Sequence, residues 1–146
     1  MTGVPPAGFT VQIDGSSKGN PGPAGIGVRI LRADGSVVKE ISRSIGVNTN
    51  NQAEYEALIC ALREVEPLAP ARVVIRTDSE LLFFQMNGKY KVKNPGLRLL
   101  HAEATGLLAR QPGVHIEVVR RELNHDTDKL AKAGADAGRA PSHLAR

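Results

Sequence analysis

The chain has 146 residues, of which 41% are hydrophobic and 23% charged, values typical of one folded domain rather than of a disordered segment. Its single cysteine, Cys60, excludes an intramolecular disulfide and a multi-cysteine zinc site. No secretory signal pattern is visible, and no apolar run approaches the roughly 20 residues that a membrane helix needs. We therefore expect a cytoplasmic, monomeric protein with no membrane partner.

The charge balance favours an anionic partner. Lys and Arg total 19 against 15 Asp and Glu, so the formal net charge is +4, and a basic domain attracts polyanions. Aromatic residues make up only 3% of the chain, which argues against a broad stacking surface for single-stranded nucleic acid. Four of the basic residues cluster in one short stretch, at Lys89, Lys91, Lys93 and Arg98.

The first third of the chain predicts three antiparallel strands. Alternating apolar residues mark strands over residues 9–14, 24–31 and 36–45. A cluster of Gly, Ser, Asn and Pro over residues 15–23 predicts a turn after the first strand, and Ala-Asp-Gly at 33–35 predicts a hairpin turn before the third.

The rest of the chain alternates helices and strands. Helical spacing begins at residue 50, with Asn50 or Asn51 as the N-cap, and ends before Pro67. The elements that follow are a strand at 72–77, a short helix at 79–86, a basic connector at 88–95, a helix at 96–110, a strand at 114–119 and a helix at 124–137. Parallel pairing of the later strands predicts an α/β fold with a five-stranded mixed sheet and helices on both faces. Residues 1–8 are expected to be a flexible N-terminus, 9–137 the domain, and 138–146 a loose tail or the start of a linker.

Three carboxylates stand in unusual places. Asp14 and Asp78 each follow an apolar strand, and Glu54 borders the apolar stripe of a helix. If the first and fourth strands are parallel neighbours, Asp14 and Asp78 lie side by side at the carboxyl ends of the strands, where active sites of α/β sheets form. Both positions also have a purely structural explanation. Asp78 could cap the helix that follows it, and Glu54 could interact favourably with the dipole at the N-terminus of its helix.

A cluster of carboxylates without His or Cys suits Mg²⁺ or Mn²⁺ rather than zinc. Two such ions can activate a water and stabilise the leaving oxygen of a phosphodiester. Asp126 and Asp128 lie near the start of the last helix, but they point in different directions, so at most one of them joins the cluster.

Five motifs occur in order along the chain: IDGSSKGNPGPAGIG at 13–27, TNNQAEYEAL at 49–58, TDSELL at 77–82, MNGKYKVKNPGL at 86–97 and NHDTDKLA at 124–131. Over residues 9–137 the chain resembles type 1 ribonuclease H, in the compact archaeal and bacterial branch that lacks the basic protrusion. The resemblance implies the ribonuclease H-like fold and endonucleolytic cleavage of the RNA strand of RNA–DNA hybrids, leaving 5′-phosphate and 3′-hydroxyl ends.

The resemblance also implies roles for individual residues. The four family carboxylates correspond to Asp14, Glu54, Asp78 and Asp128, which would hold two Mg²⁺ ions, with Mn²⁺ as a possible substitute. Thr127 stands where the family pattern has alanine. Arg121 is the expected counterpart of a residue that assists product release, whereas His125 lies in the wrong place for that role and is expected at the surface.

Substrate contacts follow from the same resemblance. Contacts to the 2′-hydroxyl, which distinguishes RNA from DNA, are expected at Gly15, Ser16, Glu54 and Ser79. Four amide side chains could contact the hybrid or only cap the helix: Asn20, Asn50, Asn51 and Gln52. Lys89, Lys91 and Lys93 could follow the DNA phosphates, or they could form a solvated basic loop.

The chain leaves three alternatives open. Some compact relatives also cut double-stranded RNA, and the sequence does not separate this activity from hybrid specificity. A ribonuclease H-like module could bind nucleic acid without cutting, although the intact carboxylates argue against this. The chain could also be one part of a longer fusion protein, since some relatives carry a phosphatase-like domain.

Overall fold

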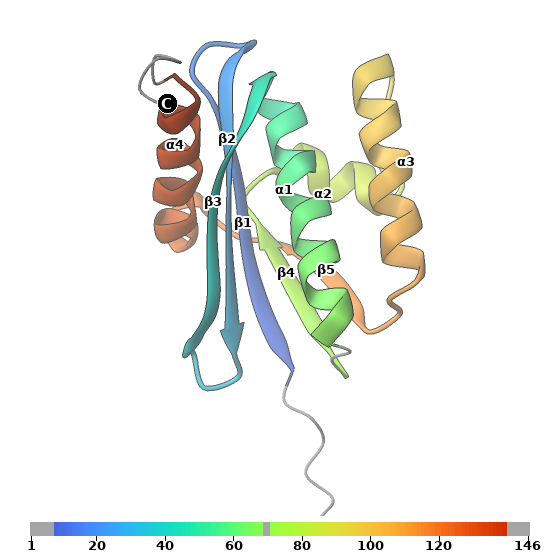
Figure 1. Cartoon of the computed structure of the whole chain (residues 1–146). Helices are drawn as coiled ribbons and strands as arrows, with labels where there is room; N and C mark the ends of the chain where they lie inside the picture. Colours follow the sequence, from blue (N-terminus) through green and yellow to red (C-terminus); the bar gives the residue numbers. More distant parts are fainter. Residues whose placement is uncertain (1–7, 69–70, 140–146) are drawn as a thin grey trace, which may run out of the picture.

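The computed structural model describes residues 8–68 and 71–139, which form a five-stranded mixed sheet with helices on both faces (Figure 1). The strands lie in the order β3-β2-β1-β4-β5. Neighbours β1, β2 and β3 pair antiparallel, whereas β4 pairs parallel with both β1 and β5. The strands are β1 (Phe9–Ser17), β2 (Gly22–Arg32), β3 (Val37–Asn48), β4 (Val73–Thr77) and β5 (Val114–Val118).

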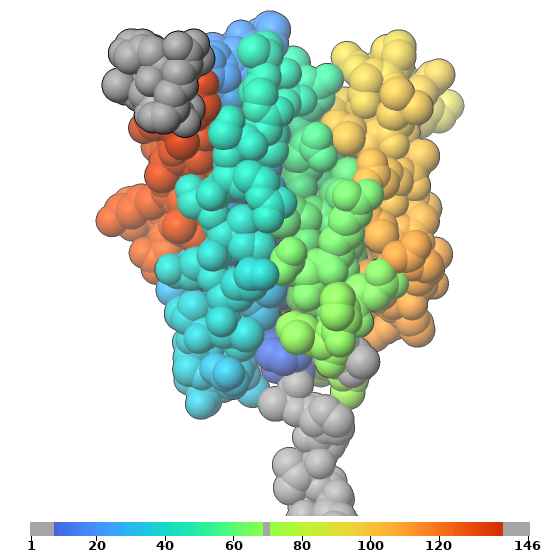
Figure 2. Space-filling view, in the orientation of Figure 1, coloured from blue at the N-terminus to red at the C-terminus, as the bar shows by residue number. Residues whose placement is uncertain are grey.

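Helices cover the two faces unequally. Helix α4 packs alone on one face, against β1, β2 and β3, while α1 packs on the other face and contacts α3 (Figure 1). Figure 2 shows α1 between β3 and α3 on the side of the molecule that faces the viewer. The helices are α1 (Asn50–Val65), α2 (Glu80–Met86), α3 (Pro95–Ala109) and α4 (His125–Arg139), with short 3-10 helices at Glu66–Leu68 and Arg121–Asn124.

The main core lies between the sheet and α1. Val11 and Ile75 of the central strands and Leu58 and Leu62 of α1 are fully buried, as the helical and strand spacing of the sequence predicts. Cys60 is buried in the same cluster, which agrees with a core position. No helix within residues 8–68 and 71–139 is both long and apolar enough to cross a membrane.

The predicted fold class and element order are confirmed, but several boundaries are wrong. Strand β1 continues through Ser17 and β2 begins at Gly22, so the turn is shorter than residues 15–23. Strand β3 extends to Asn48 because its ladder with β2 continues across two register shifts. Helix α4 begins at His125 rather than Asn124.

The ends of two helices also differ from the prediction. The N-cap of α1 is Thr49, not Asn50 or Asn51, because its hydroxyl accepts from the amide of Gln52, whose side chain accepts from the amide of Thr49. Helix α4 continues to Arg139, so the loose tail does not begin at residue 138. The predicted flexible N-terminus, apart from Gly8, and the tail from residue 140 lie outside the described residues.

Two glycines of β2 allow α4 to approach the sheet closely. A Cβ at Gly25 would lie 2.2 Å from the amide nitrogen of Ala135, and a Cβ at Gly27 would lie 2.4 Å from the carbonyl oxygen of Thr127. Both positions are therefore closed to any side chain unless the helix moves. This close packing sets where the first turn of α4, which carries Asp128, stands relative to the sheet.

We expect Gly27→Ala to lower the free energy of unfolding by about 1–3 kcal/mol, because α4 must shift to accommodate the added methyl group. Gly106→Ala in α3 is the matched control, since a Cβ there meets nothing within 4 Å and should raise stability by up to about 1 kcal/mol through helix propensity. Urea unfolding of both variants measures the difference. Equal stabilities would contradict the close α4 packing.

Candidate active site

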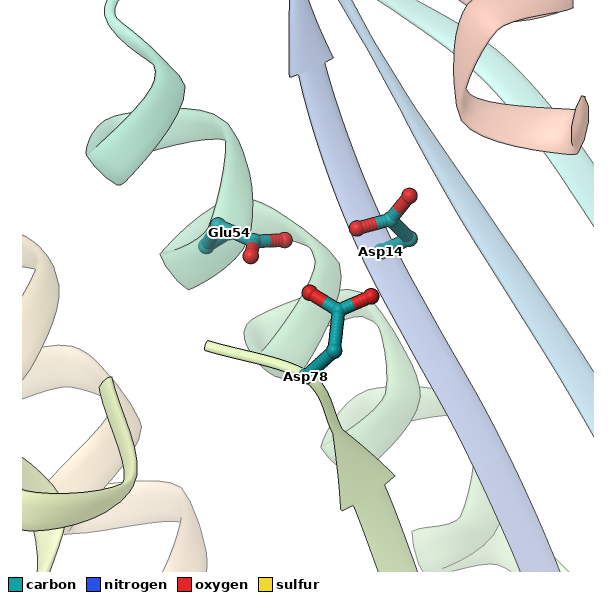
Figure 3. Close-up of side chains that lie close together, drawn as sticks. All are labelled: Asp14, Glu54 and Asp78. Carbon is teal, nitrogen blue, oxygen red and sulfur yellow. The ribbon is translucent and has the colours of Figure 1, made fainter. Parts of the chain in front are cut away.

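Three carboxylates from separate elements meet at one end of the sheet (Figure 3). Asp14 lies in β1, Glu54 in the second turn of α1 and Asp78 directly after β4. One oxygen from each side chain lies within 4.8 Å of the others. Asp14 is only 4% exposed, while the other two are half-buried. The parallel pairing of β1 and β4 is the reason that Asp14 and Asp78 share this edge.

A short contact between β1 and α1 positions Glu54. The backbone amide of Gly15 donates to Glu54 Oε1 at 2.5 Å. A Cβ at Gly15 would lie 2.3–2.5 Å from backbone atoms of Ala53 and Glu54, so only glycine allows the helix to come this close. The position of Glu54 therefore depends on the residue that follows Asp14.

The turn after β4 positions Asp78. The amide of Ser79 donates to Thr77 Oγ1 at 3.0 Å, and the hydroxyl of Ser79 accepts from the amide of Leu82 at 3.1 Å as the N-cap of α2. Asp78 is thus not the helix cap, and its carboxylate faces Asp14 and Glu54 (Figure 3). Its capping alternative is excluded because Ser79 fills that position.

Burial and mutual repulsion disturb the ionisation of the site. Burial, followed by the charges of Glu54 and Asp78, raises the pKa of Asp14. Burial and the charge of Asp78 also raise the pKa of Glu54, against the opposing effects of the Gly15 amide and the Arg121 guanidinium. Carboxylates held this close favour a bound cation or a bound proton, and an all-oxygen set of ligands suits Mg²⁺ or Mn²⁺.

Asp128 lies in the same pocket but outside the group of three. The pocket has a volume of about 500 Å³ and is lined by the three grouped carboxylates, Asp128 and Glu80, together with Arg121 and Lys132. Asp128 forms an ion pair with Lys132 at 3.0 Å. Burial acts to raise the pKa of Asp128, but hydrogen bonds with Lys132 and Asp14 outweigh it, so the pKa is lowered.

The two acids of the last helix point apart. Asp126 lies 3.2 Å from Arg29 Nη1 on β2 and contributes nothing to the pocket lining. His125, at the first position of α4, is exposed. Asp128 alone of the two acids faces the carboxylate cluster, so the structure brings it, and not Asp126, to the site.

Asn124 is a site residue that the sequence argument did not single out. Its side chain is 1% exposed, and its Nδ2 donates to the carbonyl of Ile13 at 2.8 Å and to Asp78 Oδ2 at 3.2 Å. The amide therefore joins the strand that carries Asp14 to the carboxylate of Asp78. Its Oδ1 is buried without a hydrogen-bond partner among the described residues. An asparagine before a helix resembles an ordinary cap, which conceals this role in the sequence.

Five of the predicted substrate residues lie at or beside the carboxylate pocket. Gly15, Asn50, Asn51 and Ser79 line it, and Ser16 is half-buried beside them on β1.

Asn20, Asn50 and Gln52 have structural partners. Asn20 Oδ1 accepts from the amide of Asn50 at 3.0 Å, and Asn50 Oδ1 accepts from the amide of Ser17 at 2.9 Å. Gln52 completes the capping box of α1. These bonds join β1 and the β1–β2 turn to the start of α1. Gln52 takes part in capping the helix, whereas the side chain of Asn50 bonds to β1 and does not cap it.

The predicted lysines of the connector do not line the carboxylate pocket. Lys91 and Lys93, with Arg98, line a separate pocket of about 380 Å³. The ammonium group of Lys89 lies 5.6 Å from the centre of the Phe84 ring. All three predicted lysines are exposed on the connector between α2 and α3, so the protein presents an acidic pocket and a basic connector as distinct surfaces.

The chain resembles proteins of known sequence and structure. Residues 12–134 match the family model described as "Reverse transcriptase-like". The chain is 40% identical over 128 residues to Bifunctional protein Rv2228c of Mycobacterium tuberculosis, covering 87% of this chain and 35% of that protein. It is 39% identical over 123 residues to Ribonuclease HI of Halobacterium salinarum, covering 84% of this chain and 62% of that protein.

Solved structures agree with these matches. The N-terminal RNase H domain of Rv2228c superposes with a TM-score of 0.85 at 38% identity, covering 91% of this chain and 96% of that chain. LC11-RNase H1 in complex with an RNA/DNA hybrid gives a TM-score of 0.85 at 38% identity, covering 90% of this chain and 99% of that chain. The chain thus spans about a third to two-thirds of the curated relatives it matches, but nearly all of these solved domains.

The raised pKa values predict a stability that depends on pH. In metal-free protein the folded state holds protons on Asp14 and Glu54 that the unfolded chain has already lost, so the free energy of unfolding falls as pH rises from about 4 towards the raised pKa values. Asp14→Asn removes the most buried of these groups. We expect it to stabilise the protein at pH 8 in EDTA by on the order of 1–3 kcal/mol, and far less at pH 4.

Urea unfolding at the two pH values measures this difference, and Asp126→Asn is the matched control because its carboxylate lies outside the pocket. Added Mg²⁺ should stabilise the wild-type protein more than the Asp14→Asn variant. An Asp14→Asn variant that is less stable than wild type at pH 8 would show that repulsion is not the dominant effect.

Proposed function

Because the chain belongs to the type 1 ribonuclease H family, we propose that it is an endoribonuclease that hydrolyses the RNA strand of RNA–DNA hybrids. The observation that carries the proposal is the group formed by Asp14, Glu54 and Asp78. Two similar proteins support it: one is named Ribonuclease HI, and another was solved in complex with an RNA/DNA hybrid. Intact carboxylates favour cleavage over a module that only binds nucleic acid.

The residues of the pocket fit a pair of Mg²⁺ ions, with Mn²⁺ as a substitute. Asp14, Glu54 and Asp78 offer oxygens within 4.8 Å of one another, and Asp128 adds a fourth carboxylate in the same pocket. Two such ions, when bound, polarise the scissile phosphate and ease deprotonation of the attacking water. The water oxygen bonds to phosphorus as the bond to the 3′-oxygen breaks, so the products carry 5′-phosphate and 3′-hydroxyl ends.

The chain's own residues supply orientation and charge. The Gly15 amide holds Glu54, and the Asn124 amide holds Asp78, so both carboxylates are fixed before a substrate arrives. Arg121 and Lys132 bring positive charge to the same pocket, which offsets part of the repulsion between its carboxylates and an anionic backbone.

Recognition of RNA would depend on the 2′-hydroxyl. We propose that it is contacted at Gly15 and Ser16 and by Glu54 and Ser79, since Gly15, Glu54 and Ser79 line the carboxylate pocket and Ser16 follows Gly15 on β1. Asn51, exposed at the mouth of the pocket, is the proposed groove contact among the amides of α1. The lysines of the connector would follow the DNA strand.

A cytoplasmic location, a monomeric state and a fusion to a further domain remain predictions. One relative, Rv2228c, is named a bifunctional protein, and the chain matches 35% of its length. That name motivates a search for a second domain in the full-length protein.

The proposal is tested with end-labelled substrates of one sequence: an RNA–DNA hybrid, double-stranded RNA, single-stranded RNA and double-stranded DNA, each with Mg²⁺, Mn²⁺ or EDTA. We expect metal-dependent cutting of the RNA strand of the hybrid. Additional cutting of double-stranded RNA would broaden the substrate class. Hybrid binding without cutting in either metal would overturn the proposal in favour of a binding module.

We expect Asp78→Asn to lower cleavage of the hybrid by at least about 10³-fold while binding stays within about twofold, because the change removes a metal ligand but no contact to the phosphate backbone. Cleavage is measured by gel assay and binding by fluorescence anisotropy in Ca²⁺. Asp126→Asn is the control and should keep full activity, since Asp126 pairs with Arg29 outside the pocket. Near-normal turnover by Asp78→Asn would remove Asp78 from the metal site.

We expect Arg121→Ala to slow multiple turnover by about tenfold, and single turnover much less, because the guanidinium stands beside Glu54 at the pocket and can assist departure of the charged product. Rapid-quench kinetics with enzyme or substrate in excess separates the two rates. Arg120→Ala, which changes the neighbouring exposed arginine, is the control. Equal slowing of both rates would exclude a product-release role.

A further inference from the structure

A glutamine stands where α2 would be expected to bury an apolar side chain. The residues of this short helix that are buried are Leu82 and Gln85, and Gln85 is only 5% exposed. A buried amide must satisfy both its donor and its acceptor, because each unpaired group opposes folding. Its partners therefore show what this position does.

The amide of Gln85 joins two segments that are far apart in the sequence. The hydroxyl of Tyr55 donates to Gln85 Oε1 at 2.7 Å, and Gln85 Nε2 donates to the carbonyl of Lys91 at 3.3 Å. Tyr55 is 1% exposed, and burial raises its pKa to about 12, so the hydroxyl keeps the proton that it donates. Tyr55 directly follows Glu54, so this chain of bonds begins at the turn of α1 that carries the carboxylate.

The backbone of Gln85 makes a third connection. Its carbonyl accepts from His101 Nε2 of α3 at 3.2 Å, and the His101 ring packs edge-to-face against Tyr55 with centroids 6.2 Å apart. One residue thus contacts α1, α3 and the connector at residues 88–94. This convergence fixes where the connector stands relative to the carboxylates.

The middle of the connector is held by a small number of contacts, one of which is the packing of Val92 against the core. Residues 91–94 contain no helix or strand. The amides of Lys89 and Tyr90 bond to the carbonyl of Phe84 at its start, and Arg98 Nε donates to the carbonyl of Val92 at 3.0 Å on an exposed surface. The part-buried bond from Gln85 to Lys91 is the side-chain hydrogen bond that ties this backbone to α2. Lys91, Lys93 and Arg98 line the basic pocket that this backbone shapes, and no acidic side chain lines it.

We propose that Gln85 is a positioning residue, which holds the basic connector at a fixed place relative to the turn of α1 that carries Glu54, so that both surfaces engage one hybrid at the same time. The inference rests on the proposed function. Gln85 does not line the carboxylate pocket; it lines the basic pocket but is only 5% exposed there, and its amide is bonded to protein partners. Gln85 orders Lys91 and Lys93 before the substrate binds, so the free energy of binding does not include the entropic cost of ordering the connector.

The test substitutes Gln85→Met, which keeps the side-chain length and removes both hydrogen bonds of the side-chain amide. We expect KM for the hybrid to rise about tenfold, with kcat within about twofold, and the dependence of KM on salt to become shallower as phosphate contacts are lost. Hydrogen exchange at the connector amides of Lys89 and Tyr90, which bond to the carbonyl of Phe84, should accelerate about tenfold while exchange in α1 is unchanged.

Gln111→Met is the matched control. Gln111 is also buried, at 9% exposure, and its Nε2 donates to the carbonyls of Leu62 and Leu107 at 3.0 and 3.3 Å. It lies beyond the opposite end of α3 from the connector, so it should lower stability without raising KM. If both variants raise KM equally, Gln85 has only a general structural role, and the inference is wrong.

Tyr55→Phe provides a second variant that removes one hydroxyl and no packing volume. It should change KM and connector exchange in the same direction by a smaller factor, and Tyr55→Phe combined with Gln85→Met should not exceed Gln85→Met alone, because both changes interrupt one chain of bonds. Faster exchange without a change in KM would overturn the link to substrate binding. A wild-type protein that does not cut hybrids would overturn the proposed function, while hydrogen exchange would still decide whether Gln85 holds the connector.

Discussion

The close approach of α1 to β1 at Gly15 is the constraint on which the site depends. The missing side chain lets the helix backbone come into contact with the strand, and the backbone amide of the same residue donates a hydrogen bond to Glu54 Oε1. Because Asp14 is the preceding residue of the strand, one contact brings two carboxylates together. Parallel pairing with β4 then adds Asp78, and Asn124 ties its carboxylate back to β1. The site is therefore a consequence of backbone packing more than of long-range attraction between side chains.

Such a site opposes the stability of the protein that carries it. The metal-free protein holds a nearly buried aspartate beside two other acids, and the raised pKa values of Asp14 and Glu54 reflect that burial and repulsion. The same crowding favours a divalent cation, since a cation replaces repulsion with attraction. The large buried core between the sheet and α1, together with the close packing of α4 on the glycines of β2, provides the stability that offsets this local repulsion.

Much of the fold could be predicted from the sequence because its periodic patterns are strong. Alternation in the first three strands and helical spacing after residue 50 predict the element order. The expected placement of Asp14 and Asp78 after strands predicts their meeting, although β1 continues past Asp14 to Ser17 and it is the β1–β4 ladder that ends before Asp14. The ends of the helices and strands were harder to predict from the sequence. At the start of α1, Thr49 and two asparagines are all suitable N-caps, and only the geometry of the turn decides between them. The roles of Asn124 and Gln85 were hidden for a different reason. Each depends on partners far away in the chain, with separations of 111 residues for Asn124 and Ile13 and 30 residues for Gln85 and Tyr55.

Under the proposed function, the separation between the acidic pocket and the basic connector would allow a small domain to act on a long duplex. An acidic pocket alone repels nucleic acid, and a basic surface alone binds it without directing a particular phosphate to the carboxylates. A rigid connection between the two surfaces lets attraction at one surface offset repulsion at the other, and it sets which phosphate reaches the carboxylates. In this chain the connection passes from Glu54 and Tyr55 through Gln85 to Lys91. Its buried amide is a more rigid link than the exposed lysines could provide by themselves, because the partners of that amide are fixed by the core on one side and by a backbone carbonyl on the other.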